Sequence, residues 1–138
     1  MSTVLERFRN LSTYEWFNTA LLIRKEVTLL VSSAAMPKSY RFTFAVPMVE
    51  TARALVSALV MSDAFYPNSE QNAIQRRNYM TLAIVHCEQL QQDLQCLLDM
   101  GFIKVSRIER ISTMLDRDIA LIKGARKGVK VVNTRKNA

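Results

Sequence analysis

The chain has 138 residues, of which 49% are hydrophobic and 22% charged, and its formal net charge is +7. This length suits a single domain with one core, and this composition excludes a chain that is disordered throughout. Only three glycines occur, Gly101, Gly124 and Gly128, so the first hundred residues contain none. Because hairpins, bulges and phosphate-binding loops use glycine for its positive φ, the sequence predicts an all-α fold.

Apolar residues at steps of three and four predict a first helix from 13 to 31. Its core stripe is Trp16, Ala20, Ile23, Val27 and Leu30. Ser12 or Thr13 is the expected N-cap, and the helix is expected to end before Pro37.

A second helix is expected to begin near Ser39 and to be kinked or broken at Pro47, which lacks a backbone donor. Its clearest part has Met48, Ala52, Leu55 and Leu59 on one face, and a turn signal at 67–70 follows it. Residues 40–46 also alternate in part with period two. We reject a strand there, because the sequence holds no second strand pattern to pair with it.

A third helix is predicted from about 70 to 100, with Gly101 as the residue that ends it. The fourth is predicted from about 105 to 123, after which Gly124 and Gly128 end the regular structure. Short connections favour an antiparallel up-down-up-down four-helix bundle over residues 1–126. A basic and flexible C-terminal tail is expected over residues 127–138.

The excess positive charge lies in the last quarter of the chain. Residues 1–103 hold nine basic and nine acidic side chains, whereas residues 104–138 hold ten basic and three acidic ones. Clustered Lys and Arg suit a polyanion such as nucleic acid, bound by charge and without a base code. A tail that only keeps the protein soluble is the alternative. The candidate contacts are Arg107, Arg110 and Arg117 on the fourth helix, Lys123, Arg126, Lys127 and Lys130 after it, and the doublet Arg76 and Arg77.

The sequence contains few of the residue patterns that are typical of catalytic or metal sites. His86 is the only histidine, and no carboxylate-x-x-His pattern, glycine-rich nucleotide loop, zinc-type cysteine spacing or serine elbow accompanies it. The sequence therefore predicts a protein that is not an enzyme and has no metal site and no cofactor. Cys87 and Cys96 lie about 13 Å apart on one helix, too far for a disulfide, and the sequence shows no secretory signal. A cytoplasmic location is expected.

Apolar residues cover more of each helix than one core stripe needs. Beside the seams lie Phe17, Leu21, Leu22, Val49, Val56, Val60, Ile74, Tyr79, Leu82 and Val85. Self-association, preferably in a ring, would bury a second face of this kind. A larger monomer core is the other reading.

The order of helices and the segment Met36-Pro37-Lys38-Ser39-Tyr40-Arg41-Phe42 carry a family resemblance. Over residues 12–126 the chain resembles the four-helix-bundle family of the accessory variability determinant of diversity-generating retroelements. Proteins encoded in intervening sequences of bacterial 23S ribosomal RNA genes are related to it. The Asn-Ile-Ala-Glu-Gly stretch associated with that second branch is missing, and 60–63 reads Val-Met-Ser-Asp instead.

This resemblance favours the retroelement branch and implies a function. It implies a homopentamer with a basic surface that binds a reverse transcriptase and its template RNA, or DNA or an RNA/DNA hybrid, and supports mutagenic complementary-DNA synthesis. Arg41 joins the candidate contacts by its position in this chain. The alternative is a structural or protein-binding bundle of the ribosomal intervening-sequence type with a solubilising tail.

Overall fold

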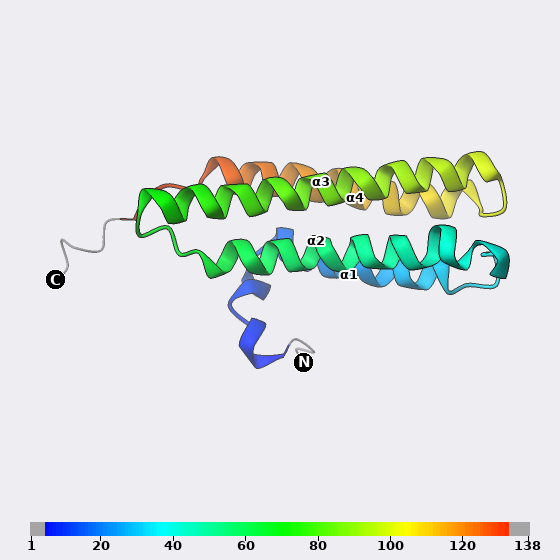
Figure 1. The fold of residues 1–138 in the computed structure, drawn as a ribbon, viewed down its shortest axis with the longest axis horizontal. Helices are drawn as coiled ribbons and strands as arrows, with labels where there is room; N and C mark the ends of the chain where they lie inside the picture. Colours follow the sequence, from blue (N-terminus) through cyan, green and yellow to red (C-terminus); the bar gives the residue numbers. More distant parts are fainter. Residues whose placement is uncertain (1–4, 133–138) are drawn as a thin grey trace.

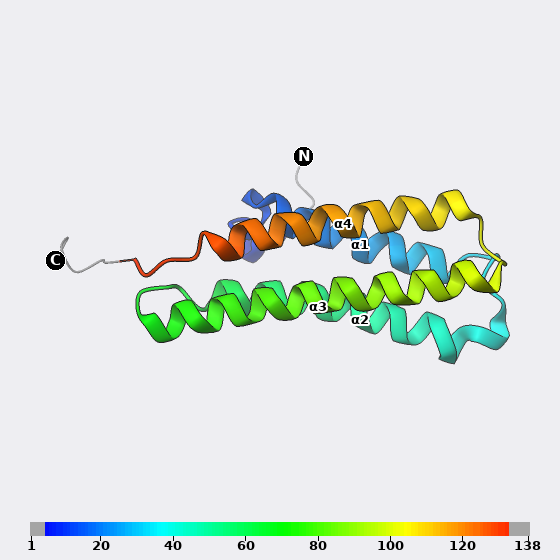
Figure 2. The same ribbon diagram turned by 90° about the horizontal axis from the view of Figure 1, so that it is seen from above.

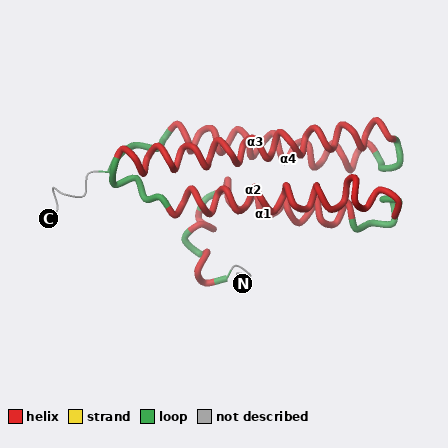
Figure 3. Tube along the Cα trace, viewed as in Figure 1, coloured by secondary structure: helices red, strands yellow, loops and turns green. Residues whose placement is uncertain are grey.

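The computed structural model describes residues 5–132, and these residues form four α-helices and no strand. The helices are α1 (Glu15–Val31), α2 (Val46–Ala64), α3 (Glu70–Met100) and α4 (Val105–Lys127). Two 3₁₀ turns, Glu6–Phe8 and Leu11–Thr13, precede α1. The predicted all-α class is confirmed (Figure 3).

The four helices lie side by side as an elongated bundle, in which α2 packs on α1 and α3, and α4 packs on α3 and α1 (Figures 1 and 2). The α1–α2 and α3–α4 connections lie at one end, and the α2–α3 connection lies at the other (Figure 1). At 31 residues α3 is about 46 Å long, so the two ends of the bundle are separated by that distance.

The core consists of the stripes that the spacing predicts. Ala20, Ile23, Val27 and Leu30 of α1 meet Met48, Ala52, Leu55 and Leu59 of α2, and all eight are fully buried. The corresponding positions of α3 and α4 are buried as well, namely Met80, Ala83, Cys87, Leu90, Leu94, Leu97, Ile108, Ile111, Leu115, Ile119 and Ile122. The seam therefore joins four helices through one core, as expected for a bundle.

The helical run around Pro47 changes type but does not break. A 3₁₀ turn, Lys38–Tyr40, leads into a π-helical turn, Arg41–Ala45, which continues directly into α2. The amide of Val46 donates to the carbonyl of Arg41, one residue wider than in an α-helix. Pro47 then sits in the first turn of α2, where proline is tolerated, and it donates no N–H to the carbonyls of the preceding π-turn. The expected discontinuity is this π-turn.

Two predicted helix ends need correction. Neither Ser12 nor Thr13 caps α1: their hydroxyls donate to the carbonyls of Arg9 and Asn10, both at 2.7 Å, inside a preceding turn. Gly124 does not end α4, which runs on to Lys127, because a glycine inside an exposed helix costs only about 1 kcal/mol. Gly101 is confirmed as the residue that ends α3, with a φ of 81° that favours glycine.

One described run, Lys38–Ala64, is long and apolar enough by length and composition alone to cross a membrane. The core helix of a bundle meets the same criterion. Here the stripe from Met48 to Leu59 packs against α1 and α3.

Candidate nucleic-acid interface

The end of α4 presents the clearest cationic surface. Lys123 and Lys127 lie in the last turns of the helix and Lys130 follows it, and all three side chains are exposed. None of them forms an ion pair within the part of the chain that the structure describes. Three free ammonium groups within eight residues can approach a phosphate backbone without first giving up an acidic partner.

Two arginines join this surface to the first turns of α3. The guanidinium of Arg77 donates to the carbonyl of Val129 at 3.2 Å and lies 3.8 Å from the carboxylate of Glu70. Arg126 donates to the hydroxyl of Thr81 at 3.0 Å. We call Lys123, Lys127 and Lys130, with Arg77 and Arg126, the basic end of the bundle.

The predicted tail begins later than residue 127. Lys127 is helical, and the amide of Val132 donates to the carbonyl of Pro67 at 2.7 Å, which fastens the chain to the α2–α3 connection. Lys130 is therefore held beside the bundle. Residues 133–138 of the predicted tail lie outside the described residues.

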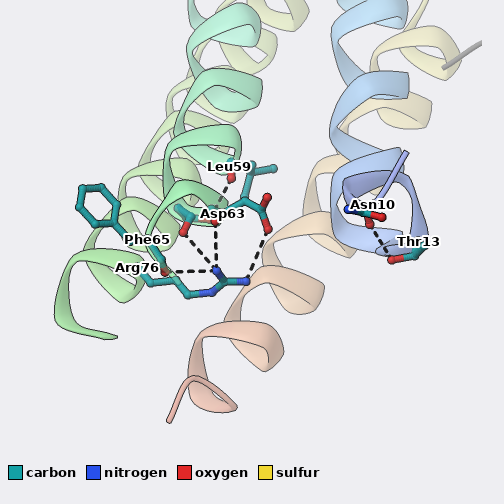
Figure 4. Close-up of polar contacts among 7 residues, drawn as sticks. Asn10, Thr13, Leu59, Asp63, Phe65 and Arg76 are labelled. Atoms are coloured by element: carbon teal, nitrogen blue, oxygen red, sulfur yellow. Dashed lines mark hydrogen bonds and ion pairs between the residues drawn. The ribbon is translucent and has the colours of Figure 1, made fainter. Parts of the chain in front are cut away.

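Arg76 has a structural position instead. Its side chain is only 13% exposed, and it donates to the carbonyls of Ser62, Asp63 and Phe65 at 3.3 to 3.4 Å (Figure 4). Its guanidinium also lies 3.7 Å from the carboxylate of Asp63. These carbonyls belong to the end of α2, where helical partners run out. Arg76 caps α2, and we take it out of the candidate interface.

Arg110 and Arg117 lie on the side of α4 that faces α1. Arg110 pairs with Glu26 at 3.0 Å, and Arg117 pairs with Glu15. Both arginines remain more than half exposed, so each pair contributes at most about 1 kcal/mol to stability. Their charge is nevertheless compensated locally. A phosphate would have to compete with a carboxylate for them.

Arg41 and Arg107 lie at the opposite end of the bundle. Arg41 is exposed at the start of the π-turn, and Arg107 is half-buried in the first turn of α4. Since the two ends are about 46 Å apart, the ten predicted residues do not form one surface. Five of them form the basic end, and Arg110 and Arg117 form ion pairs with glutamates of α1. Arg76 caps α2, and Arg41 and Arg107 lie at the opposite end.

The residue that sequence reasoning missed is Asp118. It lies on the core face of α4, fully buried, and neither carboxylate oxygen has a hydrogen-bond partner among the described residues. Burial raises the pKa of Asp118 to about 8. A signal was present in the sequence, because position 118 follows Leu115 by three residues and precedes Ile122 by four, which is core spacing.

Burial changes the pKa of two other reactive side chains, His86 and Cys87. His86 is half-buried beside α2, and burial lowers its pKa, so it is mostly neutral at pH 7. Burial raises the pKa of the Cys87 thiol, with a smaller effect from the charges of Asp118 and Glu88. Both cysteines are free, as predicted. Within residues 5–132 no three His, Cys, Asp or Glu side chains are grouped so as to hold a metal ion.

Comparison with known proteins adds no relative: no protein-family model and no curated protein matches the chain. The structure defines the fold class: this is an all-helical protein whose helices pack as in a four-helix bundle. The family resemblance described above remains a prediction.

Proposed function

We propose that this chain is a non-enzymatic RNA-binding bundle that assists a reverse transcriptase, as an accessory protein of a diversity-generating retroelement. The observation that carries RNA binding is the basic end, where three exposed lysines have no acidic partner among the described residues. The role beside a polymerase rests on the family resemblance. The proposal includes up-down-up-down order, which the alternating ends of the helix connections support (Figure 1).

Charge removal at the basic end tests this proposal. The triple variant Lys123→Gln, Lys127→Gln, Lys130→Gln should bind a 20-nucleotide RNA at least tenfold more weakly at low salt, because three phosphate contacts are lost. Its plot of log affinity against log salt should be less steep by about 2 units. Fluorescence anisotropy over a salt series measures both quantities.

The matched control removes the same charge elsewhere. Arg9, Arg24 and Lys25 are exposed cations outside the basic end, so their triple replacement by Gln should change affinity far less. Equal losses in the two triple variants would contradict the assignment, because RNA would then respond to net charge alone.

A homo-oligomer, with five subunits favoured by the resemblance, is part of the proposal. Grooves of about 580 and 450 Å³ flank α2 on its two sides, and Met61, which is 43% exposed, lines both. The larger is mainly apolar, whereas Glu50, Arg53 and His86 also line the smaller. Exposed Leu22, Ile74, Leu82 and Val85 extend the apolar surface of the neighbouring helices. Apolar surface of this extent favours burial against another copy.

Met61→Glu should therefore shift the oligomer to monomer, because a carboxylate in an apolar interface is costly to bury. Light scattering after size exclusion measures the mass. Met100→Glu is the control, since Met100 is equally exposed but lies at the end of α3. A wild-type protein that is monomeric at micromolar concentration would overturn the oligomer.

A further inference from the structure

The end of the bundle that carries the α1–α2 and α3–α4 connections is closed by an aromatic cluster. Tyr40 stacks on Phe102 with ring centroids 5.3 Å apart, and Phe44 lies 5.8 Å from Tyr40. This contact joins two connections that are some sixty residues apart in sequence. We call this region, residues 38–45 and 100–107, the loop end.

Phe42 belongs to the same segment but is left out of the cluster. It lies in the π-helical turn between Tyr40 and Phe44, and it is 81% exposed, more than any other large hydrophobic side chain in the described part of the chain. A hollow of about 860 Å³ lies next to this turn, with Met36, Val46 and Val49 among its apolar lining residues. Phe42 itself does not line this hollow, but its neighbours Arg41 and Ala45 do. An aromatic ring held in water offers its face to a flat partner.

Four cations lie either close to Phe42 in the sequence or on the other connection at the same end of the bundle. Lys38 and Arg41 line the hollow together with one acid, Glu50. Lys104 and Arg107 follow Phe102 on the other connection. None of these four cations forms an ion pair within residues 5–132. Proteins that bind single-stranded nucleic acids combine exposed aromatic rings with unpaired cations. The bases stack on the rings, and the phosphates bind the cations.

We propose that the loop end binds unpaired nucleotides of RNA, with a base stacked on Phe42 and neighbouring phosphates held by Arg41 and Lys38. This inference rests on the proposed RNA-binding function and deepens it. The basic end holds phosphates of either paired or unpaired RNA, whereas the loop end requires a base face that a duplex does not offer. The chain would thereby prefer single-stranded segments of a template.

The test compares two RNA probes on the full chain. One is a 20-nucleotide RNA without self-complementarity, and the other is the same strand annealed to its complement. Phe42→Ala should bind the single strand about tenfold more weakly and the duplex as wild type does, since stacking on one ring is lost. Phe42→Trp should keep single-strand affinity. Leu29→Ala, at an exposed apolar position of α1 outside the loop end and the grooves beside α2, should bind both probes as wild type does.

The exposure of Phe42 means that its truncation should leave the melting temperature unchanged, so the binding result is interpretable. If Phe42→Ala binds the single strand like wild type, the loop end does not stack bases, the inference is wrong and the basic end still stands. Equal losses on both probes would also overturn it. If wild type binds neither probe at low salt, the proposed RNA-binding function itself fails.

Discussion

Asp118→Asn is expected to remove most of the pH dependence of stability between pH 4 and pH 8. Folding raises the pKa of this carboxyl from 3.8 to about 8 because burial penalises the charged form. Across this range the folded protein keeps a proton that the unfolded chain has released. The free energy of unfolding therefore falls as pH rises, by about 5 kcal/mol between pH 4 and pH 8, and this contribution levels off about one unit above pH 8.

The asparagine variant separates this effect from the rest of the protein. Its amide has the shape of the protonated carboxyl and stays neutral, so the two proteins should be similarly stable near pH 4 and diverge as pH rises. His86 and Asp93, whose pKa values are also shifted by burial, titrate in both proteins and cancel in the comparison. Urea unfolding at a series of pH values measures the difference.

Asp116→Asn is the matched control. Asp116 lies two residues away on the exposed side of α4, where its carboxylate accepts a hydrogen bond from Gln91 at 2.9 Å. Its replacement should leave the slope of stability against pH close to that of wild type. An Asp118→Asn protein that keeps the full wild-type slope would show that the buried carboxyl is not the group that titrates.

Arg76→Met is expected to destabilise the fold by about 2 kcal/mol. The methionine keeps much of the apolar stem, but three carbonyls around the end of α2 lose their donor, and Asp63 loses its partner. Thermal or urea unfolding measures the loss. RNA affinity should fall no more than expected from removing one distant charge.

Arg77→Met supplies the comparison, because it removes the same charge one residue along α3. Its ion-pair partner Glu70 is 74% exposed, so this pair contributes less to stability than the cap at Arg76. Compared with Arg76→Met, we expect Arg77→Met to lose less stability and more RNA affinity. If Arg77→Met destabilises the protein more than Arg76→Met does, the division between structural and interface arginines is wrong.

The helices were predictable because their information is local and periodic. The core stripe of α3 from Met80 to Leu97 repeats at steps of three and four, and Gly101 supplies the left-handed residue that ends the helix. Lys123, which was grouped with the cations past the end of the fourth helix, lies inside α4 and is exposed. Local signals can also conflict. Gly124 was predicted to end the fourth helix because glycine is common after helix ends, but α4 continues through it to Lys127.

The candidate site was less predictable because charges find partners across the bundle. The pairing of Arg110 with Glu26 depends on which side of α4 faces α1, and helical spacing alone does not decide that. The capping position of Arg76 depends on how α2 ends beside α3. The exposure of Phe42 does not follow from α-helical spacing, because the π-helical turn that contains it changes the register of its neighbours.

The central claim is that this bundle holds RNA by its unpaired lysines, and the salt dependence of RNA affinity tests it most directly. For the wild-type chain, a plot of log affinity against log salt should be linear with a slope of about −2 to −4, as expected for three to five phosphate contacts on a single strand. No binding at 50 mM salt, or an affinity that does not change with salt, would contradict the claim.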